Sequence, residues 1–219
     1  MSRPYIELIA AVGPRWELGY HGGMPWGRIK GDLALFRQVT TGEDKLILCG
    51  RKTWQGMPGV AQRRLGARTC VVSRRLDDAD VFDALRASAA YRADYVADHR
   101  QVWGQYSGLV IIGGGEVYRA ALEADLVDVI HLSVIPRAED EDSPAALWPH
   151  DVLFPALNPR GWALTPNGSS PRFAERREPE EGAPHGWSYA QLVRNPLEPA
   201  LRPDSDGVPR FWGGVGWWC

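Results

Sequence analysis

The chain has 219 residues, a formal net charge of −2 and 44% hydrophobic residues. This composition is typical of a globular domain with a buried core, and the charge gives no overall attraction to nucleic acid or anionic membranes. No apolar run reaches the about 18 residues of a transmembrane helix, and the N-terminus lacks the pattern of a signal peptide. The cysteines Cys49, Cys70 and Cys219 form no CxxC pair, which argues against a disulfide scaffold or a metal site and predicts a reducing cytoplasm.

Apolar runs and turn residues predict alternating strands and helices along the chain. In chain order we expect a strand over 5–12, a loop over 13–31, a helix over 32–40, strands over 45–49 and 68–73, a helix over 79–91, a strand, glycine turn and helix over 108–124, and strands over 127–136, 171–177 and 186–193. This alternation predicts one α/β domain over residues 1–194 with a mostly parallel sheet. The last two strands are expected to form an antiparallel edge. Residues 195–219, rich in Trp, Pro and Gly, are expected to form a C-terminal extension.

Glycine and basic residues follow three of the predicted strands. These segments are Gly50-Arg51-Lys52-Thr53, Ser73-Arg74-Arg75 and Gly113-Gly114-Gly115. Ligands of open α/β sheets bind beyond the carboxyl ends of the strands, where glycines admit a pyrophosphate and guanidinium groups suit a further phosphate. The three segments together therefore predict an NADPH site, although each alone also fits tight packing or a solvated edge. The "GGGEVY" turn differs from the GxGxxG fingerprint, so a Rossmann fold is not expected.

Asp32 lies among apolar residues in the segment "GGMPWGRIKGDLALF". One interpretation is a helix cap, because a carboxylate interacts favourably with a helix N-terminus. The other is a buried carboxylate, which is costly unless hydrogen-bonding groups meet it. An amidine-like ring edge such as that of a pterin would supply two parallel N–H donors, with Trp26, Leu33 and Phe36 enclosing the flat ring.

Several segments together resemble the dihydrofolate reductase family over about residues 5–193. They are "ELIAAV", "LGYHGGMPWGRIKGDLALFRQVT", "GRKTW", "VVSRR", "VIIGGGEVY" and the later "LFP". The resemblance implies an eight-stranded, mainly parallel sheet flanked by helices. It also implies NADPH-dependent reduction of 7,8-dihydrofolate to tetrahydrofolate, in support of one-carbon and thymidylate metabolism. Antifolates such as methotrexate or trimethoprim are then expected inhibitors, and the protein is expected to be a monomer.

The resemblance also implies roles for individual residues. Catalytic roles fall to Asp32, Trp26 and Met24. Substrate binding falls to Ile9, Ala10, Ala11, Asp32, Leu33, Phe36, Met57, Arg68, Ile112 and Ser133. Cofactor binding falls to Ala11, Leu18, Gly19, Gly50, Arg51, Lys52, Thr53, Ser73, Arg74, Arg75, Gly113, Gly114, Gly115, Glu116, Val117 and Tyr118. In the implied mechanism hydride reaches pterin C6, water protonates N5 with the help of the Asp32 charge, and a loop over 19–24 closes on the nicotinamide.

The chain departs from the family pattern in places. The arginine that holds the folate tail is expected to be Arg68, with Arg64 as the alternative, because an ungapped count back from Ser73 reaches Ala67 instead. Residues 92–107, 137–151 and 195–219 have no assigned counterpart. The acidic segment is expected to be solvated surface, and the tail a disordered end or a strap on its own domain, with self-association through its tryptophans as the minority interpretation.

Two other functions would also fit parts of the sequence. A related NADPH-dependent reductase of a ribosylamino-pyrimidine would share the sheet and the glycine turn, but it would not need Trp26 and Asp32. A non-catalytic binding protein of the same fold would fit the tryptophan-rich tail, but it leaves Asp32, Arg51, Thr53 and the glycine turn without a purpose.

Overall fold

The computed structural model describes residues 5–42, 44–72, 106–137, 148–164, 175–179 and 186–201. Several predictions lie outside these ranges. They concern the helix over 79–91, the cofactor residues Ser73, Arg74 and Arg75, most of the segments 92–107 and 137–151, and the tail beyond 201.

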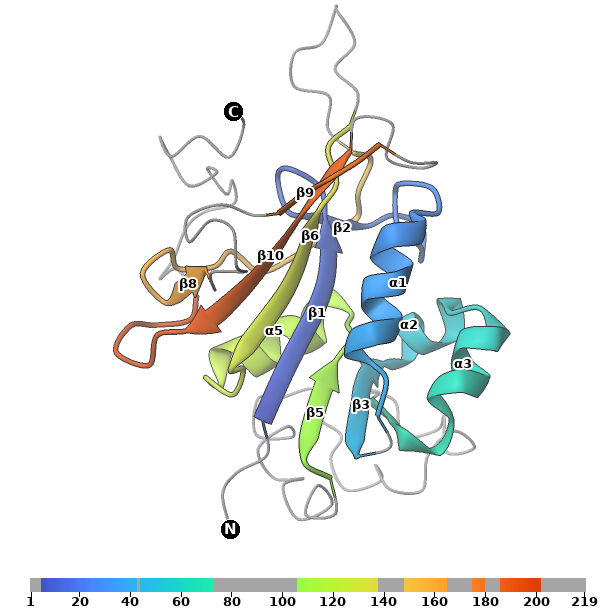
Figure 1. Ribbon diagram of the computed structural model, residues 1–219, viewed down its shortest axis with the longest axis horizontal. Helices are drawn as coiled ribbons and strands as arrows, with labels where there is room; N and C mark the ends of the chain where they lie inside the picture. Colours follow the sequence, from blue (N-terminus) through green and yellow to red (C-terminus); the bar gives the residue numbers. More distant parts are fainter. Residues whose placement is uncertain are drawn as a thin grey trace, which may run out of the picture.

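One eight-stranded sheet organises the chain (Figure 1). Its strands are β1 (Tyr5–Val12), β3 (Lys45–Gly50), β4 (Thr69–Val72), β5 (Gly108–Ile111), β6 (Val129–Val134), β8 (Trp162–Leu164), β9 (Glu175–Arg177) and β10 (Trp187–Arg194). The order is β4-β3-β5-β1-β6-β10-β8, and β9 also pairs with β10. Strands β4, β3, β5, β1 and β6 are parallel, whereas β10 runs antiparallel to β6, β8 and β9. The predicted α/β fold with an antiparallel C-terminal edge is confirmed.

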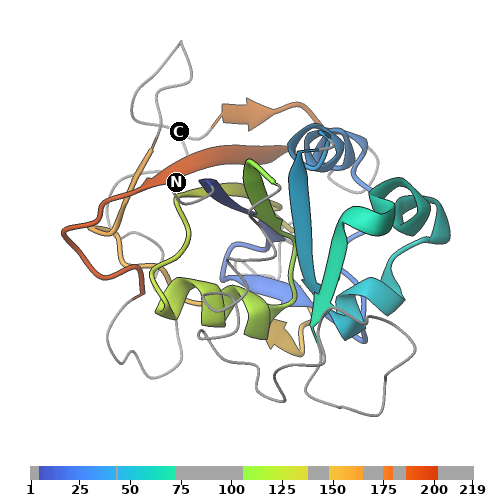
Figure 2. The same cartoon turned by 90° about the horizontal axis from the view of Figure 1, so that it is seen from below.

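Helices cover both faces of this sheet, as the end-on view in Figure 2 shows. The helices are α1 (Lys30–Val39), α2 (Arg51–Gly56), α3 (Gly59–Leu65), the short 3-10 helix η1 (Gly66–Arg68) and α5 (Gly115–Glu123). Alternation along β1 produces the two faces, because successive side chains of a strand point in opposite directions. Ile6 and Leu8 pack with residues of α5, whereas Ile9 packs in a second buried cluster with Val39 of α1. None of the described helices combines the length and apolar character needed to cross a membrane.

A small second sheet lies beside the main one. Strand β2 (Glu17–Gly19) pairs antiparallel with β7 (Val152–Leu153). Neither strand was predicted, because strands of two or three residues are too short to show the alternation of apolar and polar side chains. The pairing joins the loop that follows β1 to the segment that precedes Phe154.

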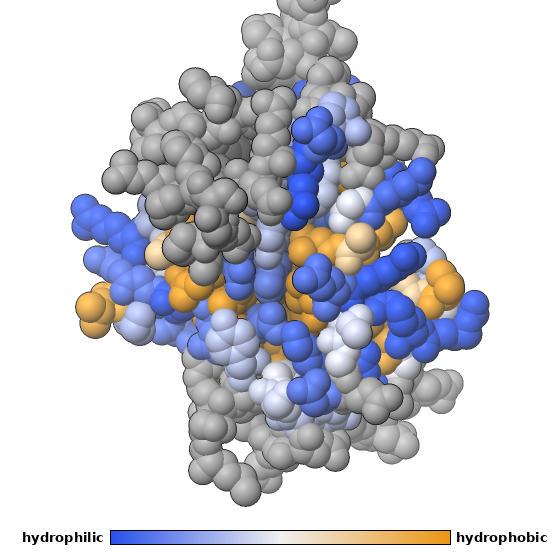
Figure 3. All heavy atoms as spheres, in the orientation of Figure 1, coloured by the Kyte–Doolittle hydropathy of each residue, from blue (hydrophilic) through white to orange (hydrophobic). Residues whose placement is uncertain are grey.

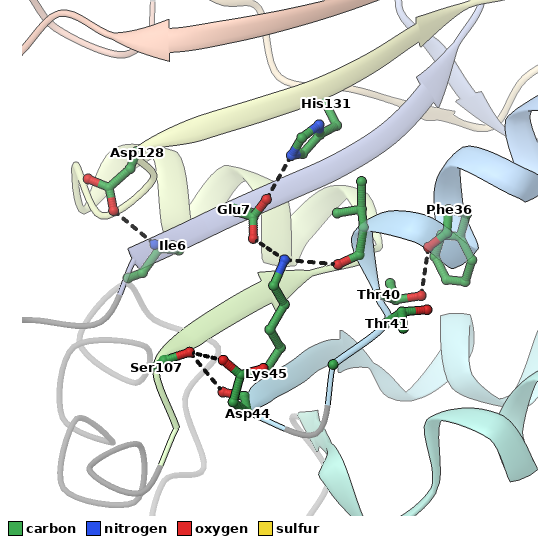
Figure 4. A network of polar contacts seen from close by, with 12 residues as sticks. Ile6, Glu7, Phe36, Thr40, Thr41, Asp44, Lys45, Ser107, Asp128 and His131 are labelled. Carbon is green, nitrogen blue, oxygen red and sulfur yellow. Dashed lines mark hydrogen bonds and ion pairs between the residues drawn. The ribbon is translucent and has the colours of Figure 1, made fainter.

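A buried polar row crosses the face of the sheet that carries α1 (Figure 4). The Lys45 ammonium donates to Glu7 Oε1 at 2.7 Å, and His131 Nε2 lies 2.8 Å from Glu7 Oε2. His131 Nδ1 lies 2.8 Å from the Tyr189 hydroxyl. Burial favours the neutral form of Glu7, but the hydrogen bonds from His131 and Lys45 outweigh it and lower the pKa of the carboxyl.

The first residues after β10 lie against the domain. The Ala200 carbonyl accepts hydrogen bonds from the Asn158 amide at 3.0 Å and from Trp162 Nε1 at 2.9 Å. Leu157 and Leu201 form an antiparallel bridge, and Ala200 is buried. This part of the predicted extension therefore packs as a strap on β8.

Candidate active site

The carboxylate of Asp32 is buried at the start of α1. Ile29 occupies the N-cap position of this helix, and Asp32 follows in the first turn with 8% of its surface exposed. Asp32 is therefore not the N-cap residue, but it lies in the first turn of α1, where a carboxylate interacts favourably with the helix dipole as expected. Asp32 shares one side of α1 with Leu35 and Phe36, which follow it by three and four residues. Both of these side chains pack on buried residues of the sheet, so this side of the helix faces the strands.

Predicted substrate residues gather between α1 and the sheet. Ile9, Ile112, Phe36 and Met57 belong to, or pack against, one buried cluster. Trp26 belongs to a second cluster, against which Ala11 packs. Leu35 contacts both clusters, so the two are continuous.

Three predicted residues differ from this group in their burial or direction. Leu33 is half-buried, as Phe36 is, but it packs against neither cluster, and Met24 is half exposed. Ala10 packs in the cluster on the α5 face, so its side chain lies on the opposite side of the sheet. A ligand between α1 and the sheet could therefore contact only main-chain atoms of Ala10.

Two buried polar groups in this region have no hydrogen-bond partner among the described residues. They are the Trp26 indole N–H and the hydroxyl of Ser133, which is 1% exposed. Ser133 lies opposite Ala11 in the register of β6 and β1. An unsatisfied buried group costs about 1–3 kcal/mol, and such groups in native proteins usually have a ligand or water as partner. Trp26 and Ser133 therefore mark a site for a polar ligand close to α1.

The glycine turn between β5 and α5 packs too closely for larger residues. The Gly113 carbonyl accepts a 2.6 Å hydrogen bond from the Gly50 amide, and Gly113 has a φ of +113°. A Cβ on Gly114 would lie 3.0 Å from Thr53 Oγ1, and one on Gly115 would lie 2.8 Å from Val152 Cγ1. The turn therefore brings β3, α2 and β7 together at the N-terminus of α5, where helix N–H groups favour an anion.

Tyr118 connects this turn to β1. Its hydroxyl donates to the Ile9 carbonyl at 2.6 Å. A Cβ on Gly113 would lie 3.0 Å from the Tyr118 hydroxyl oxygen. Burial raises the pKa of Tyr118, and the nearby Cys49 and Asp32 raise it further. The Asp32 charge thus lies close enough to Tyr118 to raise the pKa of its hydroxyl. Val117 and Tyr118 are both buried in the core.

The remaining predicted cofactor residues of α2 and α5 lie nearer the solvent. Arg51 is half-buried and donates to Gln55, whereas Lys52 and Glu116 are exposed. Lys52 is therefore free of the packing that fixes the glycine turn, and its ammonium can adjust to a bound phosphate.

A loop over 19–24 spans the region between β7 and α2. The Asp151 amide donates to the Gly19 carbonyl at 2.9 Å, and the Asp151 carboxylate accepts from the His21 amide at 3.0 Å. A Cβ on Gly56 would lie 2.9 Å from the Gly22 carbonyl, so the loop tip reaches the end of α2. Asp151 was not predicted to have a role. It falls in the acidic segment expected to be solvated surface, and its position three residues before Phe154 in the "LFP" motif was the one available signal.

Two arginines meet at the C-terminal end of α1. Arg68 donates to the carbonyls of Lys45 at 2.9 Å, Thr40 at 3.4 Å and Gly42. Arg64 donates to Thr40 Oγ1 at 3.0 Å, and its guanidinium lies 5.8 Å from the centre of the Phe36 ring. Arg68 thus uses much of its donor capacity on the main chain, whereas Arg64 lies over a predicted substrate residue.

The sheet order, the glycine turn and the buried acid define an α/β enzyme whose site lies at the carboxyl ends of parallel strands. The family model described as dihydrofolate reductase matches residues 5–178. Dihydrofolate reductase of Mycobacterium leprae is 31% identical over 158 residues, which cover 70% of this chain and 82% of that protein. Those of Candida albicans and Saccharomyces cerevisiae are each 28% identical, over 64% and 52% of this chain and 73% and 58% of theirs. The chain belongs to the dihydrofolate reductase family, a family of oxidoreductases.

Proposed function

We propose that the chain reduces 7,8-dihydrofolate to 5,6,7,8-tetrahydrofolate with NADPH, in the cytoplasm and as a monomer. The observation that carries this proposal is a set of three buried polar groups beside the two apolar clusters that Leu35 joins. They are the Asp32 carboxylate, the Trp26 N–H and the Ser133 hydroxyl, of which the last two have no partner in the described part of the chain. The relatives named above bear the name of this activity.

The substrate ring fits this arrangement chemically. The pterin ring N3–H and 2-amino group donate in parallel to the Asp32 carboxylate, and charge-assisted pairs of this kind are the stronger hydrogen bonds. The Ser133 hydroxyl bridges the same edge. Ile9, Ile112 and Phe36 supply the apolar surfaces that hold a flat ring. Either Arg64 or Arg68 binds the carboxylate at the other end of the substrate.

The residues around the glycine turn fit a dinucleotide. Gly114 and Gly115 leave the backbone open where a Cβ would collide, and the N-terminus of α5 is suited to a pyrophosphate. NADPH would be held there by Leu18, Gly19, Gly50, Arg51, Lys52, Thr53, Gly113, Gly114, Gly115, Glu116 and the neighbouring core residues Ala11, Val117 and Tyr118. When bound, NADPH supplies the hydride that pterin C6 receives. The predicted contacts of Ser73, Arg74 and Arg75 with its extra phosphate stay predictions.

The protein's own groups then favour protonation of the substrate. The anionic Asp32 stabilises positive charge on the pterin ring, which makes N5 easier to protonate. Asp32 binds the opposite edge of the ring, so a water molecule held by the Trp26 N–H delivers the proton to N5. The 19–24 loop, tied down by Asp151, excludes bulk water from the site while hydride is transferred.

The experiment compares purified wild type with Asp32→Asn, following NADPH oxidation by absorbance with dihydrofolate present. Loss of a positioned acid–base group typically costs about 10²–10⁴-fold, and we expect turnover to fall by that order while the NADPH dissociation constant stays within about twofold, because Asp32 makes no contact with the cofactor. Glu123→Gln, which neutralises an exposed acid of α5, is the matched control. Methotrexate or trimethoprim should compete with dihydrofolate in wild type. Equal turnover in wild type and Asp32→Asn at neutral pH contradicts the role of Asp32. If NADPH binds but dihydrofolate is not reduced, the substrate is to be sought among other pterins or pyrimidines.

A further inference from the structure

Trp148 is a half-buried residue beside the Trp26 cluster. It lies three residues before Asp151, in the segment expected to be solvated surface. Its side chain packs instead against buried residues that include Trp26 and Ile135. The Trp26 and Trp148 rings lie edge to face, with 5.8 Å between their centroids and an interplanar angle of 69°. Aromatic pairs prefer this arrangement because the positive ring edge meets the negative ring face, so the two indoles form a defined contact.

Contacts with the ends of two strands hold the Trp148 ring in one orientation. Its Nε1 donates to the Ile135 carbonyl at 2.9 Å, directly after β6. The Arg137 guanidinium lies 5.7 Å from the ring centre, where the ring quadrupole attracts a cation. A Cβ on Gly13 would lie 2.8 Å from Trp148 Cδ1, so the turn after β1 reaches the ring edge. The Trp148 indole is therefore fixed against β6 and β1, which are neighbours in the sheet.

Trp26 lacks a comparable polar contact. It is 5% exposed, and its indole N–H has no hydrogen-bond partner among the described residues. It lies between β2 and α1, in a segment without helix or strand. The direction of its N–H is therefore set by packing. Trp148 contributes to this packing a ring that is itself fixed by a hydrogen bond and a cation.

A docking role for the two tryptophans fits the structure less well. Aromatic residues that bind a macromolecular partner lie at the protein surface, whereas Trp26 is buried. The described residues over α1–α3 on the face shown in Figure 3 are mostly hydrophilic. The unsatisfied N–H of Trp26 indicates a small polar ligand or a water as its partner.

We propose that Trp148 is a positioning residue for the proposed reaction, because it fixes the orientation of the Trp26 indole and thereby the water that the indole N–H holds. This inference rests on the proposed function. A hydrogen bond to the charged form of a group favours that form, and such charge-assisted bonds are the stronger ones. A water held by Trp26 against the pterin N5 therefore stabilises protonated N5. If the indole turns, the water leaves this position, and N5 is protonated only at a lower pH.

The test measures hydride transfer in a single turnover across pH, because product release often limits kcat. Trp148→Leu removes the ring that lies against Trp26, whereas Trp148→Phe keeps an aromatic ring there. In Trp148→Leu the rate should fall about 3–10-fold at neutral pH and return to the wild-type value in acid, because the midpoint of its pH profile falls by about 0.5–1 pH unit. Trp148→Phe should retain most of the wild-type rate. NADPH affinity should be unchanged in both variants.

A second readout requires no turnover. Ultraviolet difference spectra of dihydrofolate, bound without NADPH, follow the protonation of N5 directly, and their midpoint should fall by the same amount in Trp148→Leu. Should Trp148→Leu not be recovered folded, Trp148→Met takes its place, because the flexible Met side chain fills irregular space without fixing an orientation.

Two controls separate positioning from stability. Trp162 on β8 is a matched indole, whose Nε1 donates to the Ala200 carbonyl at 2.9 Å and whose ring centre lies 5.6 Å from the Arg194 guanidinium. Trp162→Leu should lower the free energy of unfolding and leave the pH profile as in wild type. In a Trp26→Phe background, which lacks the N–H, adding Trp148→Leu should no longer move the profile, because the two residues act through one group.

A wild-type pH profile in Trp148→Leu overturns the inference. A loss of rate that is equal at every pH also overturns it, because lost stability alone would produce that result. The same holds for a further shift of the profile in the Trp26→Phe background. In each of these cases reduction of dihydrofolate by wild type still supports the proposed function. A wild-type protein that binds NADPH but does not oxidise it with dihydrofolate contradicts the proposed function, and the inference with it.

Discussion

Replacing Glu7 by Ala tests how much the buried polar row contributes to the fold. Removing one partner of a buried ion pair costs about 3–5 kcal/mol, because the remaining charge stays buried. The Lys45 side chain is 27% exposed and also donates to the Val39 carbonyl at 3.3 Å, so its ammonium keeps some water and one acceptor. We therefore expect a smaller loss, about 2–3 kcal/mol, which for a domain of this size lowers Tm by about 4–12 °C.

The assay is urea unfolding followed by circular dichroism at neutral pH and again on acidification. The folded-state pKa of Glu7 is lowered, so its ionised form stabilises the fold above the ordinary carboxyl pKa of about 4.3. That contribution is lost as the pH falls through the lowered value, and the difference between wild type and Glu7→Ala should shrink below about pH 4. Glu123→Ala, an exposed acid on α5, should change stability by less than about 0.5 kcal/mol. A Glu7→Ala variant as stable as that control, or a difference that grows in acid, would refute the reasoning.

Two further substitutions probe the loop and the glycine turn. Asp151→Ala removes the acceptor for the His21 amide, an exposed hydrogen bond of about 0.5–1.5 kcal/mol, so dihydrofolate turnover should fall about 2–10-fold. Asp151→Asn keeps an acceptor oxygen and should retain most of the wild-type turnover. Unchanged turnover in both variants would show that this hydrogen bond does not contribute to loop closure. Gly115→Ala places a Cβ 2.8 Å from Val152 Cγ1 and 3.2 Å from the Leu153 carbonyl, so it should displace β7 and raise the NADPH dissociation constant about tenfold. Gly59→Ala, where the nearest atom lies 3.5 Å away, is the control in fluorescence titrations, and equal NADPH affinity in the two variants would exclude a steric role for Gly115.

The sequence predicted the elements whose pattern is long and local. The apolar run of β1 and the strand, glycine turn and helix around β5 and α5 were found where expected, because burial on both faces of a parallel sheet leaves a continuous apolar signal. The burial of Asp32 was also anticipated from its apolar neighbours. Helix α3 was missed, since seven residues that begin with Gly59 and follow Pro58 resemble a loop.

Contacts between segments far apart in the chain could not be predicted from the sequence. The neighbouring "LFP" motif draws attention to Asp151, but it does not indicate that the carboxylate accepts a hydrogen bond from the His21 amide, 130 residues earlier. The choice between Arg64 and Arg68 shows the same limit. The local sequence pattern favoured Arg68, but the contacts of both arginines depend on where α1 ends. In the structure Arg68 donates to main-chain carbonyls, and Arg64 lies over the Phe36 ring. The cofactor and substrate roles of the individual residues stay predictions.

The central position of β1 has a consequence for how the chain folds during synthesis. Tyr5 pairs with Gly108 and Glu7 with Val129, so β1 acquires its two neighbours only after about one hundred more residues have been made. At about 5–20 residues per second, the ribosome needs roughly 5–20 s to deliver them. Through that interval both edges of β1 and its apolar side chains await partners. A nascent chain of this protein therefore presents a chaperone with an unpaired apolar strand, and long-range pairing of this kind favours slow folding.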